Sequence, residues 1–176
     1  VRLDVHHAMD AAIGTEKTSS IATRHGAFAA INAGFFRLDK SEFAGDAAGA
    51  LVIDGVIYSE SLNDRAGVGF MNQKRQTDVS MGHVIITRFL RAGGKVYSLG
   101  INRMLADNDV VYYDRKFGLK TPILGDVVEL ILVKNKIRSI VRSGGNSLDE
   151  KNAVISVSGN KIPDFVAQLK VGDKVQ

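Results

Sequence analysis

A two-residue turn in the first third of the chain is the sequence feature that most constrains its fold. Asp54-Gly55 stands between the apolar segments 51–53 and 56–58. An Asp-Gly pair favours a type I′ turn, in which both residues take a positive φ and two antiparallel strands are joined directly. The chain has 18 Gly and only 2 Pro, a balance that suits tight turns. Similar apolar segments bounded by turn residues predict further strands at 84–90, 95–99, 109–113, 127–133, 136–141 and 153–157.

Two helices and two more strands complete the expected elements. Thr18 or Ser19 can cap a helix that runs to His25 and that Gly26 ends. The second helix is expected at 163–169, where Pro163 occupies the first turn. The alternating residues 1–5 and the apolar residues 27–31 predict strands. The sequence therefore predicts an α+β fold, a strand-rich and mostly antiparallel, hairpin-connected sheet with two short helices.

The length of 176 residues allows one sizeable core with two lobes. We expect an N-terminal lobe at 1–101 and a smaller β-rich lobe at 102–176. Residues 174–176 follow a Gly-Asp turn and resemble the start of a strand, so we expect the second lobe to be truncated. A sheet edge near Gln176 would then be unpaired, or would be completed by another copy of the chain or a second polypeptide.

Composition excludes several classes of protein. The absence of Cys excludes disulfides, iron–sulfur clusters and thiol nucleophiles, and no apolar run is long enough to span a bilayer. The net charge of +4 is scattered and is not gathered on one helix, which argues against nucleic-acid binding. No phosphate-binding loop or nucleophile elbow is present, and we expect no cofactor. Val1 is not a translation start; removal of a signal peptide or trimming of a longer chain would account for it, and we expect an exported protein (periplasmic, cell-surface or secreted).

The segment Ala29-Ala30-Ile31-Asn32-Ala33-Gly34-Phe35-Phe36 is the most distinctive motif. An apolar strand would deliver the Asn32 amide to its own end, beside a Gly that permits close backbone approach. Taken alone, this amide is more often a structural turn residue than a site residue. Three colinear segments follow, at 48–59, 63–70 and 100–103, and in that order the pieces resemble the phosphodiester glycosidase family. That family includes the lysosomal uncovering enzyme, which removes N-acetylglucosamine from a phosphodiester, and bacterial proteins linked to exopolysaccharides.

The sequence departs from the family pattern in two places. Ala33 stands where many members have Gly, and nothing matches the Asn-Leu-Asp-Gly-Gly-Gly-Ser-Ser-like motif with which members usually end. The nearest text, Ser143-Gly144-Gly145-Asn146-Ser147, lacks the Leu-Asp lead-in. The resemblance implies a hydrolase of sugar-1-phosphodiesters that acts on a glycan or cell-envelope carbohydrate. It also implies that a second acid would come from the motif that is absent.

The resemblance places Arg65, Asn102 and Arg103 in a site with Asn32, and two nearby acids are candidates to join them. Arg65 and Arg103 would hold the phosphate, because a guanidinium binds phosphate oxygens bidentately and stabilises the leaving anion. Asn32 and Asn102 would hold the sugar. The acids nearest to the matched segments are Glu42 and Asp46, which are candidates to activate water or attack the anomeric carbon. We expect these catalytic and substrate-binding residues to converge on one cleft.

The histidines do not form a recognisable metal motif. His6 and His7 with Asp10 resemble a ligand cluster, but adjacent strand residues point to opposite faces. No His-x-x-x-His or His-Glu-x-x-His pattern occurs, so we expect no metal site. His25 is assigned to the C-terminal end of the first helix, where a cation is favourable.

Two other functions fit the same amino-acid sequence. One is a non-catalytic module that binds polysaccharide or cell wall on the same scaffold. The other is a β-rich partner-binding domain in which every Asn and Gly serves a turn.

Overall fold

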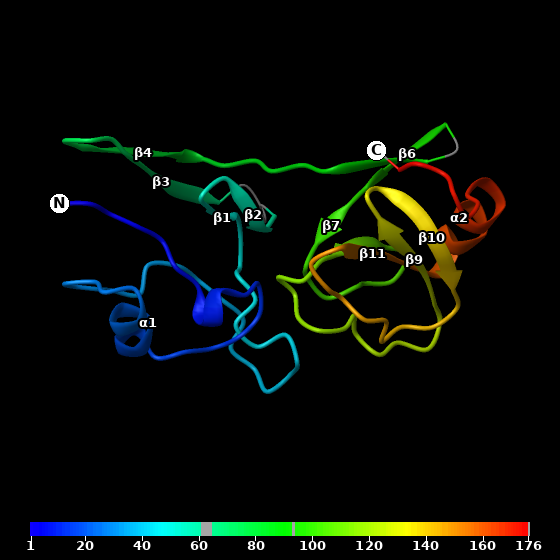
Figure 1. Ribbon diagram of the computed structural model, residues 1–176, viewed down its shortest axis with the longest axis horizontal. Coiled ribbons are helices and arrows are strands. Elements are labelled where there is room, and N and C mark those ends of the chain that lie inside the picture. The colour runs from blue at the N-terminus through cyan, green and yellow to red at the C-terminus, as the bar shows by residue number, and fades with distance from the viewer. Residues whose placement is uncertain (61–64, 93, 176) are drawn as a thin grey trace. The chain divides into compact units, whose positions relative to one another are not determined.

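The computed structural model describes residues 1–60, 65–92 and 94–175 of the chain (Figure 1). It confirms the predicted α+β class: the sheets are mostly antiparallel and two short α-helices accompany them. The chain forms two compact units, Val1–Ile86 and Thr87–Gln176. None of the described helices is long and apolar enough to cross a membrane.

The first unit consists of two hairpins preceded by short helices and long loops. It contains a 3-10 helix, η1, at Ala8–Asp10 and the α-helix α1 at Thr18–Arg24. Asp54 and Gly55 have φ values of 50° and 76°, as the predicted tight turn requires, and they join the first two strands. The four strands pair antiparallel as β1–β2 and β3–β4; they are β1 Leu51–Ile53, β2 Val56–Ser59, β3 Ala66–Asn72 and β4 Thr77–His83.

The second unit is built on a five-stranded sheet with the strand order β10-β9-β11-β8-β7. Only the β7–β8 pair in this sheet is parallel. A separate hairpin, β5–β6, precedes the sheet, and the 3-10 helix η2 and the helix α2 follow β11. The bounds are β5 Phe89–Ala92, β6 Lys95–Ser98, β7 Gly100–Ile101, β8 Val110–Tyr113, β9 Val127–Val133, β10 Lys136–Val141, β11 Asn152–Ser158, η2 Gly159–Lys161 and α2 Ile162–Gln168.

Both faces of this sheet are buried. On one face, Leu130 and Ile155 pack with Phe165 of α2 and Tyr97 of β6. On the other face, side chains of the alternate residues of β8 and β11, including Tyr113 and Val154, pack with loop residues. Two covered faces explain why β9 is apolar almost throughout, since side chains of successive strand residues point to opposite faces.

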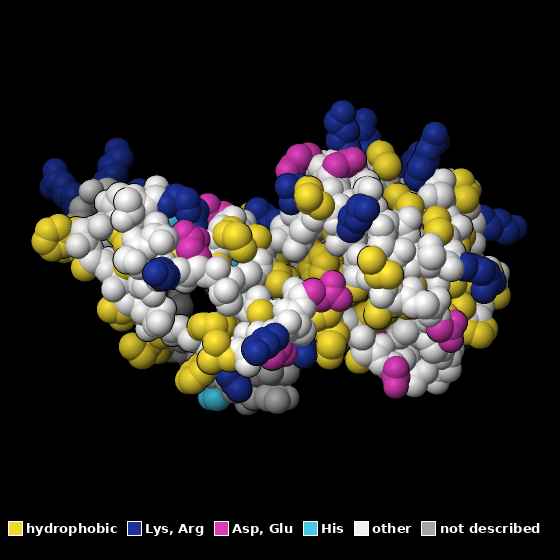
Figure 2. Space-filling model, turned by 90° about the horizontal axis from the view of Figure 1, so that it is seen from below, with side chains coloured by type: hydrophobic (Ala, Val, Ile, Leu, Met, Phe, Trp, Pro, Cys, Tyr) yellow, Lys and Arg dark blue, Asp and Glu magenta, His cyan; other side chains and the backbone are white. Residues whose placement is uncertain are grey.

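The first unit buries far less apolar surface. Among its described residues the buried apolar side chains are Ala8, Ala12, Phe43 and Tyr58. Many large apolar side chains are exposed instead, among them Phe28 at 106%, Ile31 at 84% and Leu38 at 83%. Figure 2 shows apolar side chains at many points of one face of the molecule, among scattered Lys and Arg. Such exposure is unusual for a self-sufficient domain.

Two strands predicted in this unit do not form. Residues 1–5 lie outside any strand, although Leu3 pairs with Asn72: its N–H donates to Oδ1 over 3.3 Å, and Nδ2 donates to its carbonyl over 2.7 Å. A side-chain amide thus replaces one residue of a partner strand. Residues 27–31 are also without strand structure, because no described strand runs beside them.

The units divide before the boundary expected at Ile101. Leu90 of β5 and Tyr97 of β6 are buried in the core formed by β9, β11 and α2. This hairpin therefore belongs to the second unit. The β3–β4 hairpin was not predicted, because Gly67 and Gly69 in β3 and the polar residues of β4 weaken the apolar alternation.

Candidate functional site

Asn32 lies in an exposed segment beside the first turn of α1. Its Oδ1 accepts a hydrogen bond from Thr18 Oγ1 over 2.8 Å. Thr18 was expected to cap α1, but Lys17 is the N-cap residue and makes no side-chain cap, so the Thr18 hydroxyl is available to Asn32. The Asn32 amide nitrogen remains available for a ligand, because within the described residues it has no hydrogen-bond partner.

The loop after Asn32 is closed at its base by backbone hydrogen bonds. Ala48 N–H donates to Phe35 O over 2.9 Å, and Arg37 N–H donates to Asp46 O over 2.9 Å. Asp46 lies at this base and is half-buried, whereas Glu42 lies farther along the loop and is exposed. Of the two predicted acids, Asp46 therefore has the more defined position.

Arg65 is brought to the same loop. Its guanidinium carbon lies 5.5 Å from the centroid of the Phe35 ring, within cation–π range. Its Nη1 donates to the carbonyl of Ala48 over 3.3 Å. No carboxylate of the described residues pairs with it, which leaves an uncompensated cation. The fold thus joins Arg65 to the Asn32–Phe36 segment.

Asn102 and Arg103 belong to the second unit, and both have structural partners. Asn102 is 1% exposed with φ 48°; its Nδ2 donates to Asp114 Oδ1 over 3.0 Å, and its Oδ1 accepts from Asp114 N–H over 3.1 Å. Arg103 Nη1 lies 2.5 Å from Asp109 Oδ2, and Nη2 lies 3.2 Å from Oδ1. The Asn102 amide holds a turn, and the Arg103 guanidinium already binds a carboxylate bidentately.

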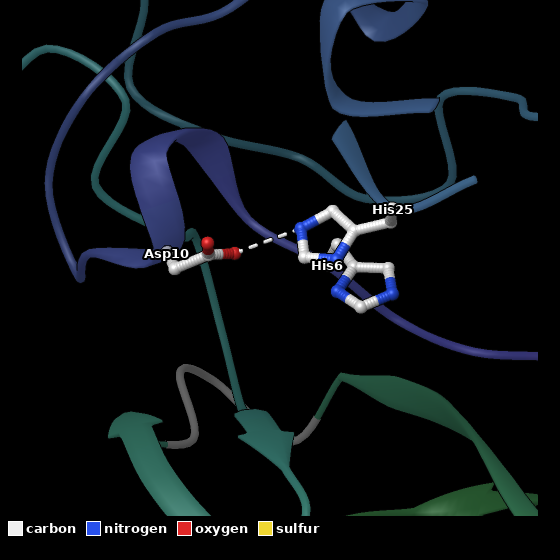
Figure 3. A group of neighbouring side chains, drawn as sticks. All are labelled: His6, Asp10 and His25. Carbon is white, nitrogen blue, oxygen red and sulfur yellow. Dashed lines mark hydrogen bonds and ion pairs between the residues drawn. The ribbon is translucent and has the colours of Figure 1, made fainter. Parts of the chain in front are cut away.

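His6, Asp10 and His25 form a cluster that the sequence did not predict (Figure 3). His25 is the C-cap residue of α1, as its position predicted, but its backbone N–H makes the cap. Its ring stacks on that of His6, with centroids 3.6 Å apart and an interplanar angle of 15°. Its Nε2 lies 3.1 Å from Asp10 Oδ1. His7 is excluded, since its Nδ1 lies 2.7 Å from the carbonyl of Ala11.

Charged groups surround this histidine–aspartate cluster. Arg24 binds Asp10, and its Nη2 donates to Glu16 Oε2 over 2.8 Å. That hydrogen bond, with another from Met9 N–H, holds the pKa of Glu16 below its ordinary value of 4.5 and raises the pKa of Arg24. Met9 and Asp10 both have positive φ, which turns the chain so that the Asp10 carboxylate reaches His25. The sequence signal for this turn is weak, because Asp10 tolerates a positive φ but Met9 rarely adopts one.

A buried carboxylate organises the second unit. Glu129 of β9 is 0% exposed. Its Oε2 accepts from Thr121 Oγ1 over 2.9 Å and from Asn146 Nδ2 over 2.7 Å, and its Oε1 accepts from Ser156 Oγ over 2.5 Å. These bonds tie two loops to the sheet. The Gly144-Gly145-Asn146 segment is thus part of a structural hydrogen-bond network around Glu129.

The fold is shared with proteins of solved structure. A predicted exported protein of Burkholderia pseudomallei K96243 is similar with a TM-score of 0.84 and 17% identity over 98% of this chain. A hypothetical protein from Synechocystis has a TM-score of 0.72 and 20% identity over 94% of the chain. This chain spans 42% and 31% of the lengths of these two proteins. No family model and no curated protein matches the sequence. At these identities the similarity shows the fold alone, which these two proteins share with the chain.

Proposed function

We propose that the chain is part of an exported hydrolase of sugar-1-phosphodiesters, with the site on its first unit. The observation that carries the proposal is the position of Arg65 over Phe35, three residues after Asn32, without a carboxylate partner among the described residues. An exposed cation beside an available amide suits a ligand that combines a phosphate with a sugar. Export is supported by the name of the Burkholderia protein.

The chemistry needs a nucleophile and a stabilised leaving group. Water, deprotonated by Asp46 or Glu42, attacks the anomeric carbon, the bond from that carbon to the phosphate oxygen breaks, and a phosphate monoester leaves with the electron pair. Arg65 stabilises the charge that accumulates on the leaving phosphate. Because a phosphate is a good leaving group, little protonation is needed. Neither arginine can protonate an alkoxide, so neutral glycosides are poor substrates.

Arg103 and Asn102 can bind the substrate only if they give up hydrogen bonds within the protein. To bind a phosphate, Arg103 has to leave Asp109. Asn102 has to break its turn with Asp114. Arg65 has no carboxylate partner among the described residues, so its substitution is the more direct test of the proposal.

The test compares hydrolysis of a panel of sugar-1-phosphodiesters by the parent and by Arg65→Ala. We expect kcat/KM to fall by about 30-fold to 1,000-fold, equivalent to roughly 2–4 kcal/mol for the loss of a charge-stabilising donor. Lys74→Ala, which removes an exposed cation of the same unit, should change it little. Equal turnover by the parent and the Arg65 variant would remove Arg65 from the mechanism. Saturable polysaccharide binding without turnover would favour a binding module.

A further inference from the structure

The cluster of His6, Asp10 and His25 has the composition and spacing of a metal site. One ligand atom from each side chain lies within 4.8 Å of the other two. Ligands of one Zn²⁺ lie 2.0–2.2 Å from the ion, so they are separated by roughly 3–4 Å. The pair His25 Nε2 and Asp10 Oδ1 already meets this at 3.1 Å. To complete the set, the His6 ring has to turn out of its stack on His25, so that one of its ring nitrogens faces the ion.

The hydrogen bonds of His25 Nε2 conflict without a metal ion. This nitrogen lies 3.1 Å from a carboxylate oxygen of Asp10 and 2.9 Å from Arg24 Nη1. The carboxylate requires a proton on Nε2, whereas a guanidinium, which only donates, requires a lone pair there. One ring nitrogen thus faces an acceptor and a donor at the same time. A cation between Nε2 and the carboxylate uses the lone pair and the oxygen together.

The local charge also favours a divalent cation. Asp4, Asp10 and Glu16 surround the two histidines with Arg24, so three carboxylates and one guanidinium leave a formal charge of −2 when the rings are neutral. Glu16 can retain Arg24 when Asp10 turns to the metal, since Nη2 already bonds to Glu16. The side chains of His6 and His25 are 28% and 23% exposed, which gives an ion access from solvent.

We propose that His6, Asp10 and His25 bind one divalent transition-metal ion of the Zn²⁺ class. Two imidazoles favour zinc, cobalt or nickel over Mg²⁺ and Ca²⁺, which prefer all-oxygen ligands. Three protein ligands leave a fourth position for water or an anionic ligand, as in sites where the metal is chemically accessible. This proposal is independent of the phosphodiester hydrolase.

The experiment titrates the metal-stripped chain with Zn²⁺ by calorimetry and with Co²⁺ by visible absorption. We expect one ion per chain and Co²⁺ bands typical of nitrogen and oxygen ligands. His6→Ala and His25→Ala should each weaken Zn²⁺ binding by more than the roughly 10–100-fold associated with the loss of an outer-shell partner. Asp10→Asn keeps the left-handed backbone, which Asn tolerates, and should weaken it at least 10-fold.

The controls are histidines outside the cluster. His83→Ala and His7→Ala should bind Zn²⁺ as the parent does, and circular dichroism should show that every variant is folded. The proposal is overturned if the parent shows no saturable binding of one Zn²⁺ per chain. It is equally overturned if the three cluster variants bind Zn²⁺ like the parent, or if His83→Ala abolishes binding.

Discussion

Arg103 and Asp109 form a two-point ion pair, with Nη1 2.5 Å from Oδ2 and Nη2 3.2 Å from Oδ1. Their side chains are 28% and 18% exposed. Asp109 also accepts from the backbone N–H groups of Ala106 and Val110, so the pair holds the loop that enters β8. Arg103→Ala should lower the free energy of unfolding by about 1–3 kcal/mol, because a partly buried carboxylate loses its charged donor. Chemical denaturation measures this.

Arg138→Ala is the matched control for this prediction. Arg138 is an exposed arginine of β10 in the same unit, and its replacement should change stability by less than about 0.5 kcal/mol. Equal effects of the two substitutions would show that the ion pair contributes nothing specific. A loss of phosphodiester turnover by a fully stable Arg103→Ala protein would instead assign Arg103 to the ligand.

The stability of the second unit should fall in acid through Asp109. Burial by itself raises the pKa of this carboxyl, but the hydrogen bond and charge of Arg103 and two backbone donors hold it below its ordinary value of 3.8. A folded-state pKa below the unfolded one gives stability that is present above pH 3.8 and is lost as the pH falls through the folded pKa. Denaturation curves between pH 6 and pH 2 should show a smaller acid loss for Asp109→Asn than for the parent. A parallel decline of the two proteins would contradict this.

Glu129 should be among the most sensitive positions of the sheet. Glu129→Ala leaves three buried or partly buried donors, from Thr121, Asn146 and Ser156, without their acceptor, at about 1–3 kcal/mol for each unsatisfied group. Glu129→Gln retains one oxygen, and the Ser156 hydroxyl can reverse its bond, so the cost should be smaller. A melting temperature of the Gln variant at or below that of the Ala variant would contradict this prediction.

The exposed apolar residues of the first unit predict self-association. In the described part of the chain, no hydrogen bond to the backbone of residues 28–34 is made, and Phe28 and Ile31 are fully or mostly exposed. An extended apolar segment with available backbone groups is a template for pairing. The 176-residue chain should therefore show concentration-dependent association in sedimentation velocity. Phe28→Ser with Ile31→Ser should reduce it, and Val171→Ser, in the second unit, should not. A monomer at every concentration would contradict this prediction.

Local chemistry in the sequence predicted the β1–β2 and β9–β10 hairpins and the second helix. Asp54-Gly55 predicts its turn because few residue pairs accept positive φ at both positions, and the structure has these values. The apolar segments 127–133 and 136–141 identified β9 and β10 on either side of Asn135, which also has a positive φ. Pro163 correctly marked the start of α2. Each of these signals depends on neighbouring residues only.

The candidate site depended on contacts between residues that are distant in sequence. The motifs predicted Asn32 and Arg65 as site residues, but only the fold showed that Arg65 lies over the ring of Phe35. The sequence likewise could not assign Arg103 to Asp109. A guanidinium binds the phosphate of a ligand and a carboxylate of the protein equally well, so the residue type does not show which one is bound.

The tertiary structure alone decided which segments found partners. Residues 27–31 have the composition of a strand, yet a strand requires a neighbour, and none lies beside them among the described residues. From the sequence, His25 was predicted only as a helix cap, because His6 and Asp10 are distant from it along the chain. The positive φ of Met9 and Asp10 turns the chain so that the three side chains lie close together. Propensity and pattern act over a few residues, whereas strand pairing and side-chain clusters depend on loop closure across many residues. Local signals in the sequence therefore determined those elements that depend on neighbouring residues, and the fold decided which segments became paired strands.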